Sequence, residues 1–169
     1  EQEEKDKALI LGWISNNENA FSRENTVAHI TASAWVVNKD RSKVLMVYHN
    51  IYNSWSWLGG HADGETDLLS VAIREVKEEA GLDVSVKSVI AIQDREKHNL
   101  PVYAYRVCKI FMLCAATGGG FEENIETTGF DYFAEDELPE LAGEKNNEEQ
   151  IRMCFDAYRA GDKWKTFFD

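Results

Sequence analysis

The sequence predicts one domain of the α/β or α+β sandwich class, on the basis of its length, its composition and the order of its periodic segments. A chain of 169 residues fits one domain, and folding at this size buries about 68–70% of the surface that the unfolded chain exposes. With 44% hydrophobic and 11% aromatic residues, the chain has enough apolar side chains for a packed core. Strand-like segments flank one central amphipathic helix, and a second such helix closes the chain. This is the element order of a layered sandwich.

The individual elements follow from periodicity and from turn residues. Helical spacing predicts helices over residues 5–17, 66–80 and 148–160. Runs rich in β-branched or aromatic residues predict strands over residues 26–38, 43–49, 54–58, 84–94, 102–114 and 130–133. The turn at 38–42 joins the first two strands as a hairpin, Gly81 stands where a left-handed residue ends a helix, and three glycines predict a flexible loop at 117–121. No repeat or long linker divides the chain, so we expect a single domain over 1–169, with a helical extension at 1–22 and the core at 25–160.

Charge and cysteine usage exclude several classes of function. The formal net charge of −12 argues against nucleic acid as a partner, because no basic stripe is present to displace counterions from a phosphate backbone. An anionic substrate therefore needs a local exception, either a cluster of arginines and lysines or a bound cation. Cys108, Cys114 and Cys154 form no C-x-x-C pair and are expected to be buried hydrophobic residues in a reducing compartment. No apolar run approaches the ~20 residues that cross a bilayer, and no signal peptide is recognisable, so we expect a cytoplasmic protein without a membrane partner.

Three carboxylates gather on one side of the central helix. Glu75, Glu78 and Glu79 are neighbours on a helical wheel, where like charges repel one another. One explanation is a solvated acidic face. The other is a site for a divalent cation, since Mg²⁺ and Mn²⁺ prefer oxygen ligands and meet substrate phosphates. The glycines at 59–60 favour the cation site because they let backbone approach a ligand closely, and Arg74 is placed to orient the carboxylates.

Residues 74–82, REVKEEAGL, resemble the second half of the Nudix box, G-x5-E-x7-R-E-U-x-E-E-x-G-U, in which U is a bulky aliphatic residue. Every specified position of this half matches, and its fixed residues recur by chance with a probability on the order of one in a million per window. The first half fits less well. Gly60 stands at the family's glycine, but Thr66 stands where the family has its first glutamate. Glu65 is the adjacent residue, and if the helix begins at Thr66 as its N-cap, Glu65 is able to reach the same space from the loop.

By this resemblance, which extends from about residue 26 to 158, the chain is identified as a member of the Nudix hydrolases. The resemblance implies an α/β/α sandwich with a mixed central sheet, to which the first helix is an addition that covers the sheet or forms part of a homodimer interface. It also implies a Mg²⁺-dependent hydrolase, with Mn²⁺ as the alternative ion. In such an enzyme, water attacks phosphorus in the diphosphate linkage of a nucleoside diphosphate derivative. The implied metal ligands are Glu75, Glu78, Glu79 and the carbonyl of Gly60, and Arg74 orients Glu75.

The general base is less well defined. In the family it is a box glutamate or a carboxylate on a later loop, so Glu123 and Glu126, near the flexible glycines, are candidates. The alternative for each is an acidic, solvated loop.

Candidate substrate contacts carry weaker signals. His61 directly follows the glycines, and Arg95 belongs to the main basic group near the middle of the chain; both are candidates to contact a phosphate. Trp57 alternates with Trp55 on one strand, where packing is the default explanation and a base-stacking platform is the alternative. The remaining histidines, His29, His49 and His98, show no spacing that suggests a metal site.

Two other functions are compatible with such a fold. A non-catalytic nucleotide-sensing module would bind without cleavage, and the displaced first glutamate makes it conceivable. The complete set of Glu75, Glu78 and Glu79 counts against it. An isomerase of allylic diphosphates would use a cysteine before the box, and residues 54–63 contain none.

Overall fold

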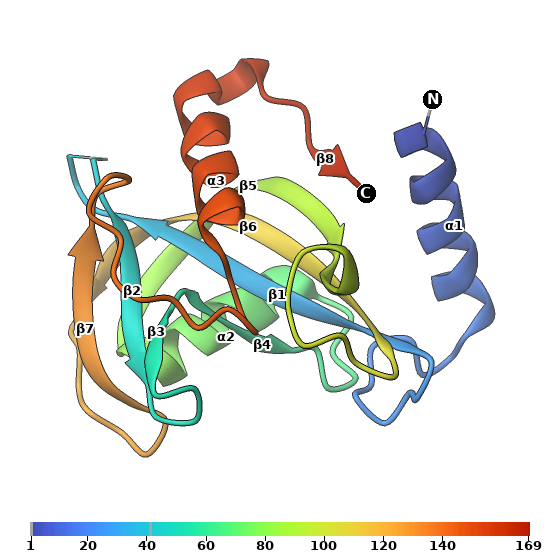
Figure 1. Ribbon diagram of the computed structural model, residues 1–169, viewed down its shortest axis with the longest axis horizontal. Helices are drawn as coiled ribbons and strands as arrows, with labels where there is room; N and C mark the ends of the chain where they lie inside the picture. The colour runs from blue at the N-terminus through green and yellow to red at the C-terminus, as the bar shows by residue number, and fades with distance from the viewer. Residues whose placement is uncertain (1, 41) are drawn as a thin grey trace.

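The β-branched and aromatic runs form one eight-stranded mixed sheet in the computed structural model, which describes residues 2–40 and 42–169 (Figure 1). The strands are β1 (Ala28–Val37), β2 (Val44–His49), β3 (Ser54–Ser56), β4 (Leu58–His61), β5 (Leu82–Asp94), β6 (Arg106–Gly119), β7 (Thr127–Phe133) and β8 (Phe167–Phe168). The helices are α1 (Gln2–Asn16), α2 (Leu68–Ala80) and α3 (Glu148–Ala160), and two 3₁₀ turns are η1 (Arg95–Lys97) and η2 (Gly161–Lys163).

Strand β1 lies at the centre of this sheet. The main path runs β3-β2-β1-β6-β5-β8, with β4 paired to β1 and β7 paired to β2. Strand β1 is parallel to β6 and antiparallel to β4, and the β1–β2 hairpin closes at Val37↔Val44. Across the β1–β4 pair, Gly59 stands opposite Ser33 and Gly60 opposite Ala32. The two glycines that precede the acidic helix are therefore held against the backbone of the central strand.

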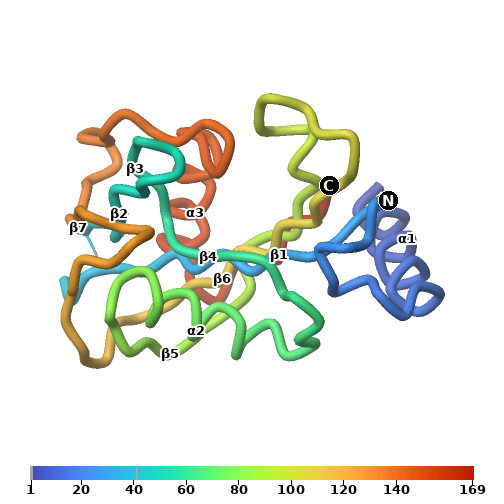
Figure 2. The backbone as a smooth tube through the Cα atoms, turned by 90° about the horizontal axis from the view of Figure 1, so that it is seen from below, coloured from blue at the N-terminus to red at the C-terminus, as the bar shows by residue number. Residues whose placement is uncertain are grey.

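Helices α2 and α3 cover opposite faces of the sheet (Figures 1 and 2). On one face, Val71, Ala72 and Val76 of α2 enter a core with β1, β2 and β6. On the other face, the apolar residues of α3 pack with Trp35 and Phe111. The α/β/α sandwich with a mixed sheet is confirmed. Each helix buries one stripe of apolar side chains, as the helical spacing of these residues requires.

Helix α2 begins one residue later than Thr66 would cap it. The N-cap is Asp67, whose side chain accepts hydrogen bonds from the backbone N–H of Leu69 and Ser70. The predicted start at residue 66 is therefore wrong, because a carboxylate caps the free N–H groups of the first turn better than a threonine hydroxyl does. Gly81 ends the helix with φ of 66° and donates its N–H to the carbonyl of Lys77, as predicted.

The chain departs from the predicted elements at three places. The strand expected at 54–58 is two short strands, β3 and β4, because β3 pairs with β2 whereas β4 pairs with β1. The prediction of a flexible loop at 117–121 is wrong for Thr117–Gly119. These residues continue β6, which pairs here with the start of β5. The two-residue strand β8, parallel to β5, is too short to give a sequence pattern.

Helix α1 does not cover the sheet. None of its residues is buried, and Leu9 and Leu11 are 72% and 54% exposed. Ile14 in its last turn packs against the core, and the helix lies beside β8 at one end of the molecule (Figures 1 and 2). The expectation that α1 covers the sheet is therefore wrong, whereas the homodimer interface stays a prediction.

The cysteines behave as hydrophobic side chains. Cys114 and Cys154 are buried, Cys108 is half-buried, and all three are free thiols. Burial raises the pKa of the thiols of Cys108 and Cys114 to about 12, so both remain protonated at neutral pH. Of the three helices described, none combines the length and the apolar character that crossing a membrane requires.

Candidate active site

One cleft of about 350 Å³ brings together most of the chemistry-bearing residues. Its walls come from β1, β2, β4, α2, β6, η1 and the loops that connect these and neighbouring elements. Two groups of side chains line it, a carboxylate cluster and a basic cluster. The carboxylate cluster is His49, Glu75, Glu79 and Glu126; the basic cluster is Arg95, Lys109 and Lys145. The chain as a whole is negatively charged, and an anionic substrate needs a local group of positive charges. The basic cluster in this cleft is such a group.

Glu79 is the most enclosed member of the carboxylate cluster, at 2% exposure. Its Oε2 accepts the backbone N–H of Gly59 at 2.9 Å, and its Oε1 accepts the ammonium of Lys145 at 2.8 Å. Burial raises the pKa of this carboxyl, and the charge and hydrogen bond of Lys145 oppose the shift. The Glu79 side chain is therefore fixed between the backbone of Gly59 in β4 and Lys145, which lies in the loop before α3.

Glu75 lies against the glycine turn. A Cβ placed on Gly60 would come within 2.2 Å of Glu75 Oε2, so this carboxylate occupies the space that any other residue at position 60 would fill. Arg74 donates to Glu75 Oε1 at 2.9 Å and to the carbonyl of His61 at 3.4 Å. Burial raises the pKa of Glu75, the hydrogen bond from Arg74 lowers it, and the neighbouring charge of Glu79 raises it again. Arg74 thus contacts Glu75 directly, and its role in orienting this carboxylate stays a prediction.

The loop before β7 brings Glu126 to the same place. Asn124 donates to the carbonyl of Glu78, and Thr127 donates through its hydroxyl to the carbonyl of Glu79 at 2.6 Å. These bonds tie the loop to the last turn of α2, whose carbonyls have no partner within the helix. One ligand atom each from His49, Glu79 and Glu126 lies within 4.8 Å of the others.

His49 is a member of the cluster that no sequence pattern predicted. It ends β2, and its Nε2 lies 3.7 Å from Glu79 Oε1. Burial lowers the pKa of this histidine to about 4, and the charge of Lys145 lowers it too, so the ring is neutral and able to offer a lone pair. Its distance in sequence from the box, and the absence of a regular spacing, left no signal from which it could have been found.

The donor set fits a hard divalent cation. The carboxylates of half-buried Glu75 and buried Glu79 have raised pKa values, so a cation beside them would offset both their desolvation and their mutual repulsion. Oxygen ligands from neighbouring turns suit Mg²⁺ or Mn²⁺, and the imidazole of His49 is acceptable to Mn²⁺. Gly60 lines the same cleft, so its carbonyl stays a predicted ligand.

Three carboxylates that the sequence considered for the site lie outside this cleft. Glu78 has a 63% exposed side chain and lines a separate hollow with Glu123. Glu65 is exposed and accepts the backbone N–H of Asp67 at 2.8 Å, so it braces the turn before α2 instead of reaching the carboxylate cluster. The adjacent position therefore does not replace the missing first glutamate of the box.

The candidate substrate contacts separate into two kinds. His61 and Arg95 line the cleft, as expected for residues that meet a phosphate. Burial lowers the pKa of His61 to about 4, helped by the charge of Arg23, so the ring is neutral. Trp57 is 1% exposed and packs in the core near Phe111, which agrees with packing and not with a base-stacking platform.

Comparison with known proteins agrees with this geometry. Residues 27–154 match the profile of the NUDIX domain. The chain is 36% identical over 128 residues to "Putative ADP-ribose pyrophosphatase YjhB" of Bacillus subtilis, a match covering 76% of this chain and 61% of that protein. It is 29% identical over 113 residues to "Nucleoside diphosphate-linked moiety X motif 6" of Xenopus laevis, covering 66% of this chain and 50% of the relative. The chain thus spans between half and two thirds of the length of these two curated relatives.

Solved structures show the same likeness. An ADP-ribose pyrophosphatase from Streptococcus suis has a TM-score of 0.74 at 39% identity, covering 83% of this chain and 98% of that one. A UDP-X diphosphatase has a TM-score of 0.75 at 25% identity, covering 83% of this chain and 66% of that one. Since the domain profile covers most of the sequence and the fold agrees, the chain belongs to the Nudix family.

Proposed function

We propose that this chain is a Mg²⁺-dependent hydrolase that cleaves the diphosphate linkage of a nucleoside diphosphate derivative. The observation that carries the proposal is the pair of carboxylates, half-buried Glu75 and buried Glu79, held against Gly59 and Gly60 of β4 in a cleft that also contains basic side chains. ADP-ribose is the first substrate to test, because two of the similar proteins bear the name ADP-ribose pyrophosphatase.

Glu75 and Glu79 would hold the cation, with His49, Glu126 and the Gly60 carbonyl as further donors. The cation, when bound, polarises the phosphoryl group and makes water a better nucleophile. The carboxylate cluster alone would repel a diphosphate, so the basic cluster offsets the charge on its non-bridging oxygens. Arg74 keeps Glu75 in one orientation, which matters because positioning and electrostatics supply most of the rate in phosphoryl transfer.

The reaction needs one proton acceptor. The oxygen of water forms a bond to phosphorus, the anhydride P–O bond breaks with its electron pair leaving on the departing phosphate, and one proton of the water moves to a carboxylate. We assign this role to Glu126, because it is exposed to solvent yet lies within the cluster that includes His49 and Glu79. A carboxylate on an anchored loop is suited to this task, since it reaches the water without being a principal ligand.

The test of the proposed function is a substrate screen. Wild-type protein with Mg²⁺ is incubated with ADP-ribose, UDP-sugars and dinucleotides, and ³¹P NMR follows the products. We expect multiple turnovers of at least one compound, with ¹⁸O from labelled water in one phosphate product and no activity in EDTA. Saturable binding with no turnover of any compound would instead favour a nucleotide-sensing module.

Glu126→Gln should lower kcat on the order of 10²-fold with little change in KM, because the amide cannot accept the proton from water. Glu123→Gln is the matched control, since Glu123 is exposed on the same loop and lines a different hollow. Steady-state kinetics on the best substrate of the screen measures both variants. Equal activity of the two variants would remove Glu126 from the reaction.

A further inference from the structure

Lys109 is a buried lysine that has no carboxylate partner among the residues the structure describes. It stands on β6, is 4% exposed, and its ammonium lies 5.3 Å from the ring centres of Trp57 and Phe111. Its hydrogen bonds go to neutral acceptors, the side-chain oxygen of Asn99 at 3.2 Å and the carbonyl of Lys145. Burial, together with the charges of Arg95 and Lys145, lowers its pKa to about 7.

Arg95 has a donor group without a partner. The residue is 4% exposed and belongs to η1. Its Nη1 donates to Glu96 at 2.8 Å and to the carbonyl of Pro101 at 2.9 Å, and its guanidinium lies 3.6 Å from the ring centre of Tyr103. Its Nη2, in contrast, is buried and has no hydrogen-bond partner among the described residues. A buried donor of this kind is costly unless something binds to it.

These two cations meet at one short stretch of backbone. Arg95 donates through Nε to the carbonyl of Glu144 at 3.2 Å, and Lys109 donates to the carbonyl of the next residue, Lys145. Both cations line the cleft. The ammonium of Lys145 donates a hydrogen bond to Glu79. Lys145 therefore lies between the two cations, Arg95 and Lys109, and the carboxylate cluster.

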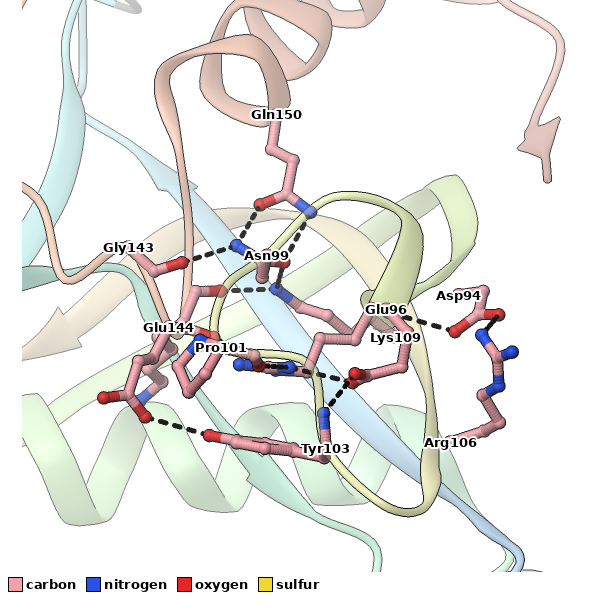
Figure 3. Close-up of polar contacts among 12 residues, drawn as sticks. Asp94, Glu96, Asn99, Pro101, Tyr103, Arg106, Lys109, Gly143, Glu144 and Gln150 are labelled. Atoms are coloured by element: carbon pink, nitrogen blue, oxygen red, sulfur yellow. Dashed lines mark hydrogen bonds and ion pairs between the residues drawn. The ribbon is translucent and has the colours of Figure 1, made fainter.

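A network of buried polar side chains also holds Lys109 in place, through its acceptor Asn99 (Figure 3). Asn99 exchanges hydrogen bonds with Gln150 at 3.1 and 3.3 Å and donates to the carbonyl of Gly143 at 2.9 Å. Gln150 also donates to Gln93 at 3.1 Å. Such a satisfied network holds its members in one geometry, which a flexible surface lysine would not need.

Cations that converge in a low-dielectric site repel one another, and an apolar residue at position 109 would avoid that repulsion. A bound anion would remove it, and would supply the partner that Arg95 Nη2 lacks. We propose that Arg95 and Lys109 form a phosphate subsite, which holds one phosphate of a diphosphate substrate while the other phosphate faces the carboxylate cluster. The subsite rests on the proposed function, because it assumes that a diphosphate lies in this cleft.

The experiment compares a monophosphate with a diphosphate that cannot be cleaved. AMP and α,β-methylene-ADP are titrated into the protein in Mg²⁺ by calorimetry, with wild type, Lys109→Met and Lys109→Gln. Methionine keeps the unbranched stem between the two rings, and glutamine keeps a donor without the charge. Lys165→Met, at an exposed lysine outside the cleft, is the matched control. Thermal melts of all variants identify any that fail to fold.

Wild type and the control should bind α,β-methylene-ADP at least about tenfold more tightly than AMP, because one additional charged hydrogen-bonded contact is made. In both Lys109 variants this ratio should fall to about threefold or less. A ratio that stays at its wild-type value in a folded variant overturns the proposal. The proposed function would be tested separately, because neither nucleotide needs to be turned over.

Discussion

Glu75→Gln should lower kcat/KM on the order of 10³-fold or more, because it removes a negative charge from the pair of carboxylates that would hold the cation. The amide keeps the shape of the side chain, and its oxygen can still accept the hydrogen bond from Arg74. Since burial raises the pKa of Glu75, neutralising this side chain should not destabilise the fold. The expected loss is therefore one of activity and not of folding.

Glu65→Gln is the control that makes this result informative. Both residues are candidates for carboxylates of the box, but Glu65 is exposed and accepts the N–H of Asp67, an interaction that a glutamine oxygen also makes. We expect Glu65→Gln to keep at least about half of the wild-type kcat/KM. Steady-state kinetics and Mn²⁺ binding followed by electron paramagnetic resonance measure both variants, and Glu75→Gln alone should weaken Mn²⁺ binding. Similar losses in the two variants would contradict the placement of Glu65 outside the site.

The two adjacent glycines should respond differently to alanine. In Gly59→Ala, the new Cβ would come within 2.4 Å of the carbonyl oxygen of Ala32 and 2.7 Å of the Cα of Ser33, in a residue with φ of 140°. Backbone of the central strand cannot move away cheaply, so we expect a loss of about 3 kcal/mol or more in the free energy of unfolding. In Gly60→Ala, the three atoms nearest to the new Cβ would all belong to the carboxylate of Glu75, which is able to turn aside.

Gly60→Ala should therefore keep its fold, lose about 1 kcal/mol or less in stability, and lose most of its activity because Glu75 is displaced. Urea denaturation followed by tryptophan fluorescence measures stability, and the substrate of the screen measures activity. If Gly60→Ala retained full activity, or if Gly59→Ala were as stable as wild type, the contacts described for these glycines would be wrong.

The sequence predicted the layers of the fold and the centre of the site for a physical reason. Helix α2 has one apolar face, a C-terminal glycine and carboxylates at neighbouring turns. All three are local patterns that can be recognised without knowledge of the tertiary structure. The same pattern singled out Glu75 and Glu79, which line the cleft, and Arg74, which is hydrogen-bonded to Glu75. It also predicted Glu78 as a ligand, whose side chain points largely to solvent, because a helical wheel does not say how deep each residue lies.

The remainder of the cleft depends on contacts between distant segments. His49, Lys109 and Lys145 come from a strand end, a strand interior and a loop, and no spacing links them. A lysine within an apolar strand gives no local sign that its ammonium faces neutral carbonyls. Strand β8 and the split between β3 and β4 are also set by pairing partners and not by propensity, which explains why the sequence could not give them.

The loop that carries Glu126 is fastened to the last turn of α2 by Asn124 and Thr127, which bond the carbonyls of Glu78 and Glu79. Glu126, to which we assign the role of proton acceptor, is thus tied through its loop to the helix that carries the carboxylates of the box. The position of Glu126 relative to Glu79 is therefore set by side chains beside Glu126 that bond the main chain of the helix, and not by any direct contact between the two carboxylates.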